Sequence, residues 1–557
     1  MATGRWLLPA RYTNRSLARD LGMLVPWLES PVGYGSVLGV LAILAGIGTV
    51  ATIVLVLNTP KFIALSVIGM LGAASYMLSG NRRLFVLYGF VLLAPLKLGL
   101  NFVVIGHQGG AQSFVIHATD FLLIMLAIYQ YYDWRRKRVP DYRMPLVGKL
   151  WLGMMLLGLV SVFTSEFQTP AAHEVVRMGK NLVILLLLVN ELRRKKQFQH
   201  LALALMLGVM VQSAFSIVSY SAGSQLGLEF LGEETEKNVI ELGEATLKGD
   251  AQIRRPGGLM GHPNQFAGYL ALVMPIGIAL MFSPISTVTK ALFIVALGLG
   301  QIGLLLTLSR SGWICFAVAL MFTLGLSFLH RSSRRRYFIA RMSIIALVGM
   351  VGLAASPRIL ERIQYSDPES WRSRMEMIDI AWKIVRDKPL FGLGLNSYVF
   401  AQPPYTRFRT YAGMEEFYGE NVPVVHSTWM LTWAEQGTLG MALFVFIHLV
   451  VLYVGFNNLK LKDGFLHATN VGALSGFIAL MLDGLVSFFL RMDAGGRMFW
   501  LSLSIILAIG YWRRTYETGA ALSAPSRVIS DGRDRAARNW LVPQRTGGGG
   551  ARGWLGR

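Results

Sequence analysis

The residues best suited to chemistry in this chain are two histidines that each stand directly before an apolar segment. His262 lies in the run Gly261-His262-Pro263-Asn264, and His426 lies in the run Val425-His426-Ser427-Thr428. An imidazole has an unperturbed pKa of about 6.5, so it can accept a proton near neutral pH. Each histidine is therefore a candidate general base, although a histidine at a helix start is also commonly a satisfied polar residue without a catalytic role.

Arginines accompany both histidines. A guanidinium is always charged, and its planar fork matches phosphate oxygens. Together with an imidazole, such groups suit a reaction in which a hydroxyl loses its proton while an anionic phosphate leaves. Neither histidine has a neighbouring carboxylate cluster, so we expect no metal site and no cofactor. The arginines are Arg254, Arg255, Arg310, Arg372 and Arg374.

The composition indicates the kind of element that must position these residues. Hydrophobic residues make up 54% of the 557 residues and charged residues only 15%, which excludes a soluble globular protein. Since a hydrocarbon core about 30 Å thick needs roughly 20 apolar residues per helix, we expect an all-α polytopic membrane protein with about 14 spans (12 to 14). The apolar runs are too long and too continuous for barrel strands. The expected spans are residues 36–57, 61–80, 84–101, 115–133, 147–165, 176–194, 198–220, 264–283, 288–308, 312–329, 340–356, 427–456, 467–490 and 499–512.

The distribution of charge predicts the orientation. The net charge is +22, and the basic clusters fall in every second connection between the expected spans. This alternation is the positive-inside rule, and it places both termini in the cytoplasm. A basic face beside anionic lipid explains the charge better than nucleic-acid binding does. The clusters are Arg82 and Arg83, 135–138, 193–196, 331–336, Lys460 and Lys462, and Arg513 and Arg514.

The predicted organisation is one membrane domain, 36–512, between two cytoplasmic tails. Residues 1–35 form the first tail, and residues 513–557 form a basic second tail that we expect to be disordered. Two long connections share the outer face, namely an acidic loop at 221–255 and a large, partly helical loop at 357–425. Long loops in compact folds are usually functional or disordered.

The large loop has local structure of its own. A capping signal at Ser366-Asp367-Pro368 starts an amphipathic helix, and Lys388-Pro389 stops it. The run Phe391-Gly392-Leu393-Gly394-Leu395 then predicts a flexible turn. Apolar residues recur at helical spacing in the helix, at Trp371, Met375, Ile378, Trp382 and Val385.

Ionisable residues inside the expected spans fall toward the outer half of their helices. Such groups are costly in a membrane and usually face protein or a watery cavity, so their common depth predicts a polar cavity that opens outward. Snorkelling near helix ends is the alternative explanation. The residues are Lys97, Asp120, Arg177, Lys180 and Asp483. The chain has one cysteine, Cys315, and therefore cannot form a disulfide within itself.

Four motifs in the second half, in this order and with this topology, resemble the O-antigen ligase and polymerase superfamily. The resemblance covers residues 254–454, while the first 220 residues match only as a set of spans. The motifs are Arg255-Pro256-Gly257-Gly258-Leu259-Met260-Gly261-His262-Pro263-Asn264, Thr307-Leu308-Ser309-Arg310-Ser311-Gly312, Pro389-Leu390-Phe391-Gly392-Leu393-Gly394, and Val425-His426 leading to Glu435-Gln436-Gly437-Thr438-Leu439-Gly440.

The resemblance implies a metal-independent glycosyltransferase of the bacterial inner membrane that uses an undecaprenyl-diphosphate-linked glycan at the periplasmic face. His426 matches the family's proposed base for the acceptor hydroxyl. Arg255 and Arg374 match the arginines that hold the donor diphosphate, and Arg310 is a further candidate. Supporting roles are expected for Arg254, His262, Arg177, Lys180 and Arg372.

Two departures from the family pattern bear on these expectations. Ser427 follows the histidine where the family commonly has asparagine, and the acidic insertion between Ser221 and Asp250 is unusually large. The acceptor stays open, since a ligase and a polymerase differ in whether they use a lipid core, a protein side chain or another repeat unit. A solute transporter or a structural component of an envelope assembly is the alternative, although a transporter is expected to carry internal repeats and midplane charges.

Overall fold

The computed structural model describes residues 69, 72–106, 109–139, 142–233, 239–241, 252–328, 368–405 and 424–517. The chain divides into two compact units, Met1–Leu87 and Tyr88–Arg557, and the second unit contains every feature considered below except the start of α5. The expected spans at 36–57 and 340–356, half of the span at 61–80, the whole first tail and most of the second tail lie outside the described residues.

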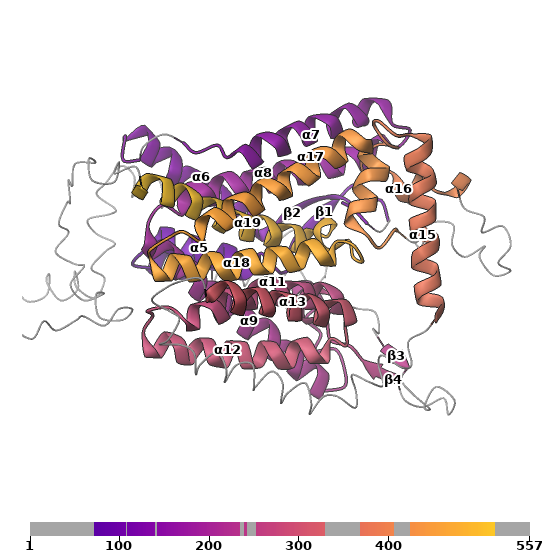
Figure 1. The fold of residues 1–557 in the computed structure, drawn as a ribbon. Helices are drawn as coiled ribbons and strands as arrows, with labels where there is room; N and C mark the ends of the chain where they lie inside the picture. Colours follow the sequence, from indigo (N-terminus) through magenta and orange to yellow (C-terminus); the bar gives the residue numbers. More distant parts are fainter. Residues whose placement is uncertain are drawn as a thin grey trace, which may run out of the picture. The chain divides into compact units, whose positions relative to one another are not determined.

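Helices dominate the described part of the chain (Figure 1). Eight of them are long and apolar enough to cross a membrane, namely α7, α9, α11, α12, α13, α17, α18 and α19. This finding supports the predicted helical membrane protein, while the total of 12 to 14 spans stays a prediction. The helices are α5 (Arg82–Leu93), α6 (Ala118–Arg135), α7 (Leu146–Thr164), α8 (Gln168–Glu191), α9 (Lys195–Ser221), α11 (Pro263–Met281), α12 (Thr287–Leu306), α13 (Arg310–Ser327), α15 (Pro368–Asp387), α16 (Tyr398–Ala401), α17 (Thr428–Asn458), α18 (Gly464–Asp483) and α19 (Asp493–Glu517).

Two short hairpins and four single turns of 3-10 helix occupy connections between described helices, so the all-α prediction holds for the spans but not for every connection. Strand β1 (Gly99–Phe102) pairs antiparallel with β2 (Phe114–His117), and β3 (Val239–Glu241) pairs antiparallel with β4 (Gln252–Arg254). The 3-10 turns are η1 (Glu229–Leu231), η2 (Gly258–Met260), η4 (Pro403–Tyr405) and η7 (Phe489–Arg491).

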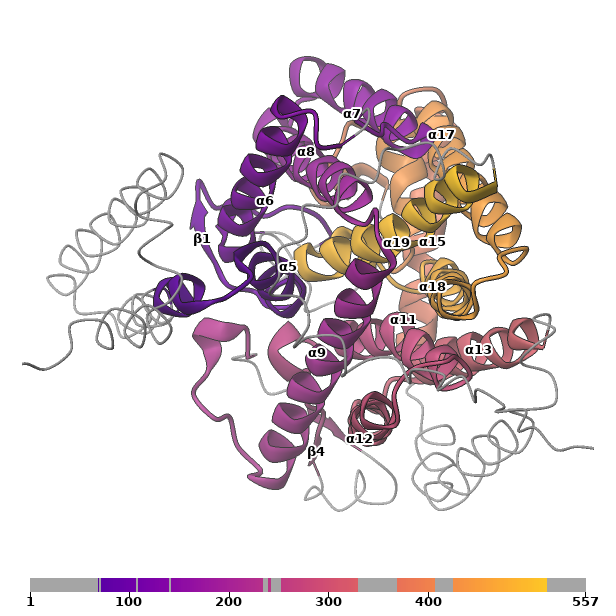
Figure 2. The same cartoon turned by 90° about the vertical axis from the view of Figure 1, so that its left-hand side faces the viewer.

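The centre of the bundle is built from α11, α18 and α19 (Figure 2). In the most apolar 18-residue stretch of each helix, 89%, 83% and 94% of the residues, respectively, are buried. Helices α11 and α18 pack almost backbone to backbone. A Cβ at Gly472 would lie 2.3 Å from Ile276 Cα, and a Cβ at Gly476 would lie 2.2 Å from Leu272 O. The two glycines lie four residues apart on α18 and allow this close approach. Helices in lipid gain no hydrophobic driving force from association, so van der Waals contact at such small residues stabilises their packing instead.

Helix α15 lies at an angle to α17 and packs on it (Figure 1). Its buried face is apolar and belongs to one core cluster with the start of α17, which explains why an otherwise polar loop carries an amphipathic helix. The helix ends at Asp387, directly before Lys388-Pro389, so the predicted stop is confirmed. The buried residues are Met377, Ile380, Ala381, Ile384 and Val385.

The turn after α15, at 391–395, is docked on α17. The amide of Leu393 donates to Ala434 O (3.0 Å), and that of Gly394 donates to Glu435 O (2.9 Å). The prediction of a flexible turn was therefore wrong. Its glycines serve close approach, because a Cβ at Gly392, where φ is +70°, would lie 2.6 Å from Ala434 O.

Helix α17 accepts this turn because its backbone breaks at Gly437, which has φ 62° and ψ −168°. Beyond the break, the amide of Thr438 donates to Pro389 O (2.8 Å). A Cβ at Gly437 would lie 2.3 Å from Leu390 O. The two glycine motifs of the large loop and of α17 are thus the two sides of one junction.

Candidate functional site

His426 stands at the entrance to α17, held by the turn that follows α18. The amide of Thr428 donates to both Gly484 O (2.8 Å) and Ser487 O (2.9 Å). The imidazole ring packs on Phe488, with ring centroids 5.2 Å apart. The ring forms no hydrogen bond within the described part of the chain, so both of its nitrogens remain available there.

Burial and the neighbouring charge of Arg374 lower the pKa of His426 to about 4. The ring is therefore neutral at pH 7 and can accept a proton. The same low pKa makes His426 a weak base as long as no anion neutralises the charge of Arg374. An anion that neutralises Arg374 would raise the pKa and strengthen the base.

The charge of one arginine acts on His426, and the charge of a second arginine, on a separate element, acts on the first. Arg374 lies on α15, and Arg310 is the first residue of α13. Burial and the charge of Arg310 lower the pKa of Arg374 below its usual value. Among the described residues, neither arginine has a hydrogen bond or a close ion pair. Asp483 is the acid whose charge acts on Arg374, and its Oδ2 also lacks a hydrogen-bond partner in this part of the structure.

Arg255 is oriented by two hydrogen bonds. Its Nε donates to Thr307 O (2.8 Å), and its Nη2 donates to Asn264 Oδ1 (3.0 Å). These contacts tie the start of α11 to the turn that carries Arg310. The motif around Arg255 and the motif around Arg310 therefore meet, although 55 residues separate the two arginines in the sequence.

His262 caps α11, and this role decides which of its nitrogens carries the proton. Its Nδ1 accepts a hydrogen bond from the amide of Asn264 (3.1 Å), so the neutral ring holds its proton on Nε2. Burial, Arg255, Lys97 and His426 lower its pKa to about 4. His262 is thus a hydrogen-bond donor through Nε2 and not a general base through that atom.

Lys97 completes this group of residues. A Cβ at Gly261, where φ is +83°, would lie 2.4 Å from Lys97 Nζ, so the glycine makes room for the ammonium beside His262. We call the group the basic cluster, and its members are Lys97, Arg255, His262, Arg310, Arg374 and His426.

The structure places the remaining two candidates as follows. Arg254 is the last residue of β4, and its side chain is outside what is described. Arg372 is exposed on α15, two residues before Arg374. Because residues two apart do not share a face of a helix, Arg372 points away from the direction of Arg374.

Arg177 and Lys180 belong to a different group of contacts. Arg177 pairs with Glu174 on the same helix, and Lys180 Nζ lies 2.5 Å from Asp120 Oδ2. Glu174 Oε1 also lies 3.4 Å from Arg491 Nε, so these ion pairs extend to η7, which contains Arg491. The five intramembrane ionisable residues predicted to share one cavity are therefore divided between ion pairs within the bundle and the surroundings of the basic cluster.

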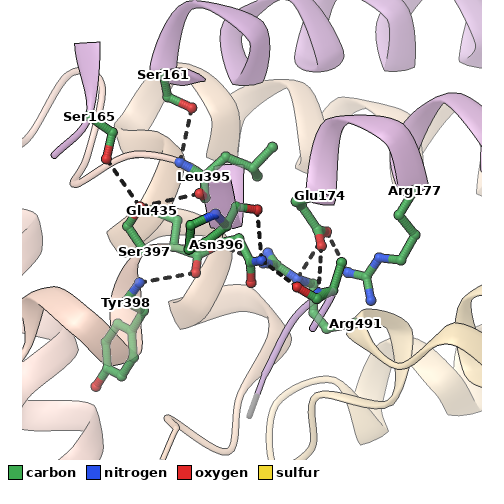
Figure 3. A network of polar contacts seen from close by, with 12 residues as sticks. Ser161, Ser165, Glu174, Arg177, Leu395, Asn396, Ser397, Tyr398, Glu435 and Arg491 are labelled. Carbon is green, nitrogen blue, oxygen red and sulfur yellow. Dashed lines mark hydrogen bonds and ion pairs between the residues drawn. The ribbon is translucent and has the colours of Figure 1, made fainter. Parts of the chain in front are cut away.

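Arg491 is the centre of this second network, and Figure 3 shows it between Glu174 and Glu435. Its Nη2 lies 2.7 Å from Glu435 Oε2. Glu435 Oε1 in turn accepts the amide of Tyr398 (3.3 Å), and Asn396 Nδ2 donates to Ala111 O (2.9 Å). Sequence reasoning assigned no role to Glu174 and Arg491, although a charge beside an apolar span was a usable signal.

A partly open cavity of about 40 Å³ adjoins this network. It has room for a few water molecules but not for a glycan. Both polar atoms of the Gln436 amide are buried there without a partner among the described residues, which favours bound water. The polar lining residues are Glu174, Arg177, Asn181, Thr428, Thr432, Gln436 and Arg491.

The charges of the basic cluster suit an anion. It gathers several cations and two neutral imidazoles, with Asp483 as the acid that acts on Arg374. Within the described ranges, no group of three or more His, Cys, Asp or Glu side chains could hold a metal ion. Guanidinium groups fixed at this density can bind a diphosphate or a comparable anion.

The fold and this site define a helical membrane protein with a cluster of basic side chains around two histidines. Residues 291–445 match the family model of the O-antigen ligases, and this match supports an O-antigen ligase/polymerase-family protein. The match includes Arg310, Arg374 and His426, whereas Arg255 and His262 precede it. No curated protein matches the chain at a significant level.

Proposed function

We propose that this protein transfers a glycan from an undecaprenyl-diphosphate carrier to the hydroxyl of an acceptor sugar, without a metal ion, in the synthesis of a cell-surface polysaccharide. The reaction would take place at the periplasmic face of the bacterial inner membrane, with both termini in the cytoplasm. The basic clusters in alternate connections support this orientation.

One contrast between buried cations carries the proposal. Arg177, Lys180 and Arg491 all have carboxylate partners within 4 Å. Arg374 and Arg310 have none among the described residues, although the charge of Arg310 acts on Arg374. Uncompensated charges in a partly buried site are costly, so a site that keeps two of them is suited to an anionic ligand.

The roles of the residues follow from the bonds that change. His426 takes the proton of the acceptor hydroxyl, the acceptor oxygen forms a bond to the anomeric carbon, and the bond from that carbon to the diphosphate oxygen breaks. Arg374 and Arg310 stabilise the charge that develops on the leaving diphosphate. The proton on His426 passes to water when the products leave. A single base without a carboxylate nucleophile favours inversion at the anomeric carbon.

Donor binding also prepares the base in this scheme. A diphosphate beside Arg374 compensates the charge that keeps the pKa of His426 low. The pKa of His426 then rises, and the ring becomes a stronger base only when a donor is present. His262 donates a hydrogen bond from its Nε2–H to a phosphate oxygen. Arg255 holds the start of α11 against the turn that carries Arg310.

The surface beside α15 supports an acceptor made of sugar. Trp382 is 37% exposed and meets Trp433 edge to face, with ring centroids 5.4 Å apart. The guanidinium of Arg386 lies 5.4 Å from the Trp382 ring centre. Aromatic faces bordered by polar groups suit sugar rings. The acceptor itself, which separates a ligase from a polymerase, stays open.

The test is transfer of a labelled glycan from undecaprenyl diphosphate in proteoliposomes that contain EDTA. We expect His426→Ala and Arg374→Ala each to lower the rate about 100-fold or more, because each removes a proton acceptor or a charge stabiliser from the transition state. Lys383→Ala is the matched control on the outer face of α15, where Lys383 pairs with Asp379, and it should retain the rate.

Retained transfer in a folded His426→Ala variant would overturn the assignment of the base. A requirement for a divalent ion would overturn the metal-free mechanism. Absence of transfer by the intact chain with several acceptors would favour the transporter alternative, for which solute flux in the same vesicles is the assay.

A further inference from the structure

We propose that Leu390 and Phe391, in the connection after α15, insert into the lipid leaflet on the side of the large loop and anchor α15 at the membrane surface. The two side chains are 59% and 62% exposed, although both are large and apolar. Adjacent exposed apolar side chains in a connection favour contact with another apolar surface. The inference concerns the depth of α15 in the membrane and does not depend on the proposed reaction.

The break in α17 indicates the depth of this connection. All of α17 is about 46 Å long at 1.5 Å per residue, whereas the hydrocarbon core is about 30 Å thick. The part after the break, 438–458, is about 32 Å long and matches the core, while Glu435, before the break, belongs to the buried ion-pair network. Because the amide of Leu439 donates to Leu390 O (3.4 Å), the connection lies at the edge of the hydrocarbon.

Helix α7 indicates the same depth independently. It is 19 residues or about 28 Å long, so its last turn lies at the edge of the hydrocarbon. The amide of Leu395 donates to Ser161 Oγ in that turn (3.1 Å), and Ser165 Oγ, directly after α7, lies 3.2 Å from Ser397 Oγ. Two separate spans therefore place the turn at 391–395 at the boundary between hydrocarbon and headgroups.

The apolar surface of the connection continues onto the outward faces of these spans. Large exposed side chains that are apolar or aromatic recur at helical spacing along α17, and another stands near the end of α7. Because α7 and α17 are candidate membrane spans, such faces meet lipid chains, and lipid at the edge of the core also reaches Leu390 and Phe391. The exposed residues are Leu439, Phe446, Leu449 and Tyr453 on α17 and Phe163 on α7.

The direction of α15 agrees with a position at the membrane surface. Figure 1 shows α15 running crosswise to α17 and α18, so it lies along the surface that these spans cross. Its buried apolar face packs on α17, and the chain beyond its end at Asp387 reaches the hydrocarbon edge. Arg386 and Lys388 are exposed beside the two apolar side chains, where cations meet lipid headgroups. Such an anchor keeps α15, and with it Arg374, at a constant depth.

The experiment measures the depth of single positions of the full chain in nanodiscs of phosphatidylethanolamine and phosphatidylglycerol. Cys315→Ser removes the native thiol, which is buried, and Phe391→Cys or Leu390→Cys then carries the fluorophore NBD. Lipids with a nitroxide near the headgroup or near the end of the acyl chain quench the label according to its depth. We expect the shallow nitroxide to quench both labelled variants at least about twofold more strongly than the deep nitroxide does.

Two matched variants calibrate the measurement. Asp379 stands two residues from both Met377 and Ala381 of the buried face, so it lies on the opposite side of α15. A label at Asp379→Cys should respond to iodide in the water and to neither nitroxide. A label at Leu449→Cys, on the outward face of α17, should respond most to the deep nitroxide.

Quenching of the Phe391→Cys and Leu390→Cys labels by iodide, without quenching by either nitroxide, would overturn the proposal, because the connection would then lie in water. Absence of quenching by all three agents would overturn it as well, because another part of the chain or a second copy would then cover these side chains. The two substitutions alter exposed positions separately, so either folded variant decides the question.

Discussion

At the scale of residues, the two histidines of the site have the same side chain but different capacities. Neither nitrogen of His426 is engaged among the described residues, whereas Nδ1 of His262 accepts the amide of Asn264. The helix cap thus fixes His262 as a donor. Only His426 is free to take a proton in either tautomer, and its strength as a base depends on Arg374.

The pH dependence of transfer tests this coupling. Burial is the larger cause of the lowered pKa of His426 and the charge of Arg374 is the second, so Arg374→Gln should raise this pKa from about 4 part of the way toward its usual value. The imidazole must be unprotonated to act as a base, so a higher pKa should move the acidic limb of the rate profile to higher pH. The maximum rate of the variant should also be lower. The measurement is kcat/KM for glycan transfer between pH 4 and pH 8. Arg386→Gln, near the far end of α15, should leave the limb unchanged, and a fixed limb in Arg374→Gln would contradict the coupling.

At the scale of elements, the junction between the turn at 391–395 and the break in α17 positions the large loop. Both sides of the junction need glycine, because φ is +70° at Gly392 and +62° at Gly437, and a Cβ at either position would strike backbone atoms. The junction connects α15, which carries Arg374, to the helix that begins two residues after His426. The spacing of the arginine and the histidine therefore depends on it.

We expect Gly437→Ala to lower the stability of the protein by more than about 1 kcal/mol, since alanine at a positive φ is strained and has no space here. Transfer should fall together with stability as α15 shifts. Gly298→Ala on α12 is the control, because a Cβ there meets no atom within 4 Å, and it should be neutral or stabilising. Thermal unfolding in detergent measures both variants, and equal melting temperatures would refute the account of the junction.

At the scale of the whole second unit, buried ion pairs hold separate helices and the large loop together. Arg491 lies between Glu174 of α8 and Glu435 of α17, and Glu435 also accepts the amide of Tyr398. A buried pair of this kind is weak evidence for net stability, but the loss of one partner leaves an uncompensated buried charge. The network therefore specifies one arrangement of these elements.

Arg491→Met should destabilise the protein by roughly 3–5 kcal/mol, because the buried carboxylate of Glu435 loses its cation and that of Glu174 keeps only Arg177. Lys383→Met removes an exposed pair on α15 and should cost below about 1 kcal/mol. Chemical unfolding in mixed micelles gives both values. A cost for Arg491→Met as small as that for Lys383→Met would show that the carboxylates find other partners or become protonated.

The sequence by itself determined the helical membrane class, the candidate base and arginines, and the end of α15 before Lys388-Pro389. Each of these depends on short-range information: apolar run length, helical spacing and a proline that cannot continue a helix. The family match at 291–445 agrees with the resemblance carried by the motifs around Arg310 and His426.

Only the tertiary structure decided which groups face one another. It paired Arg177 with Glu174 and Lys180 with Asp120, left Arg374 without a close partner among the described residues, and docked a turn expected to be flexible. These outcomes depend on the rotation and approach of helices that are far apart in the chain, as in the glycine contact between α11 and α18. Local periodicity fixes which face of a helix is apolar, but packing between helices fixes the charge that each polar group meets.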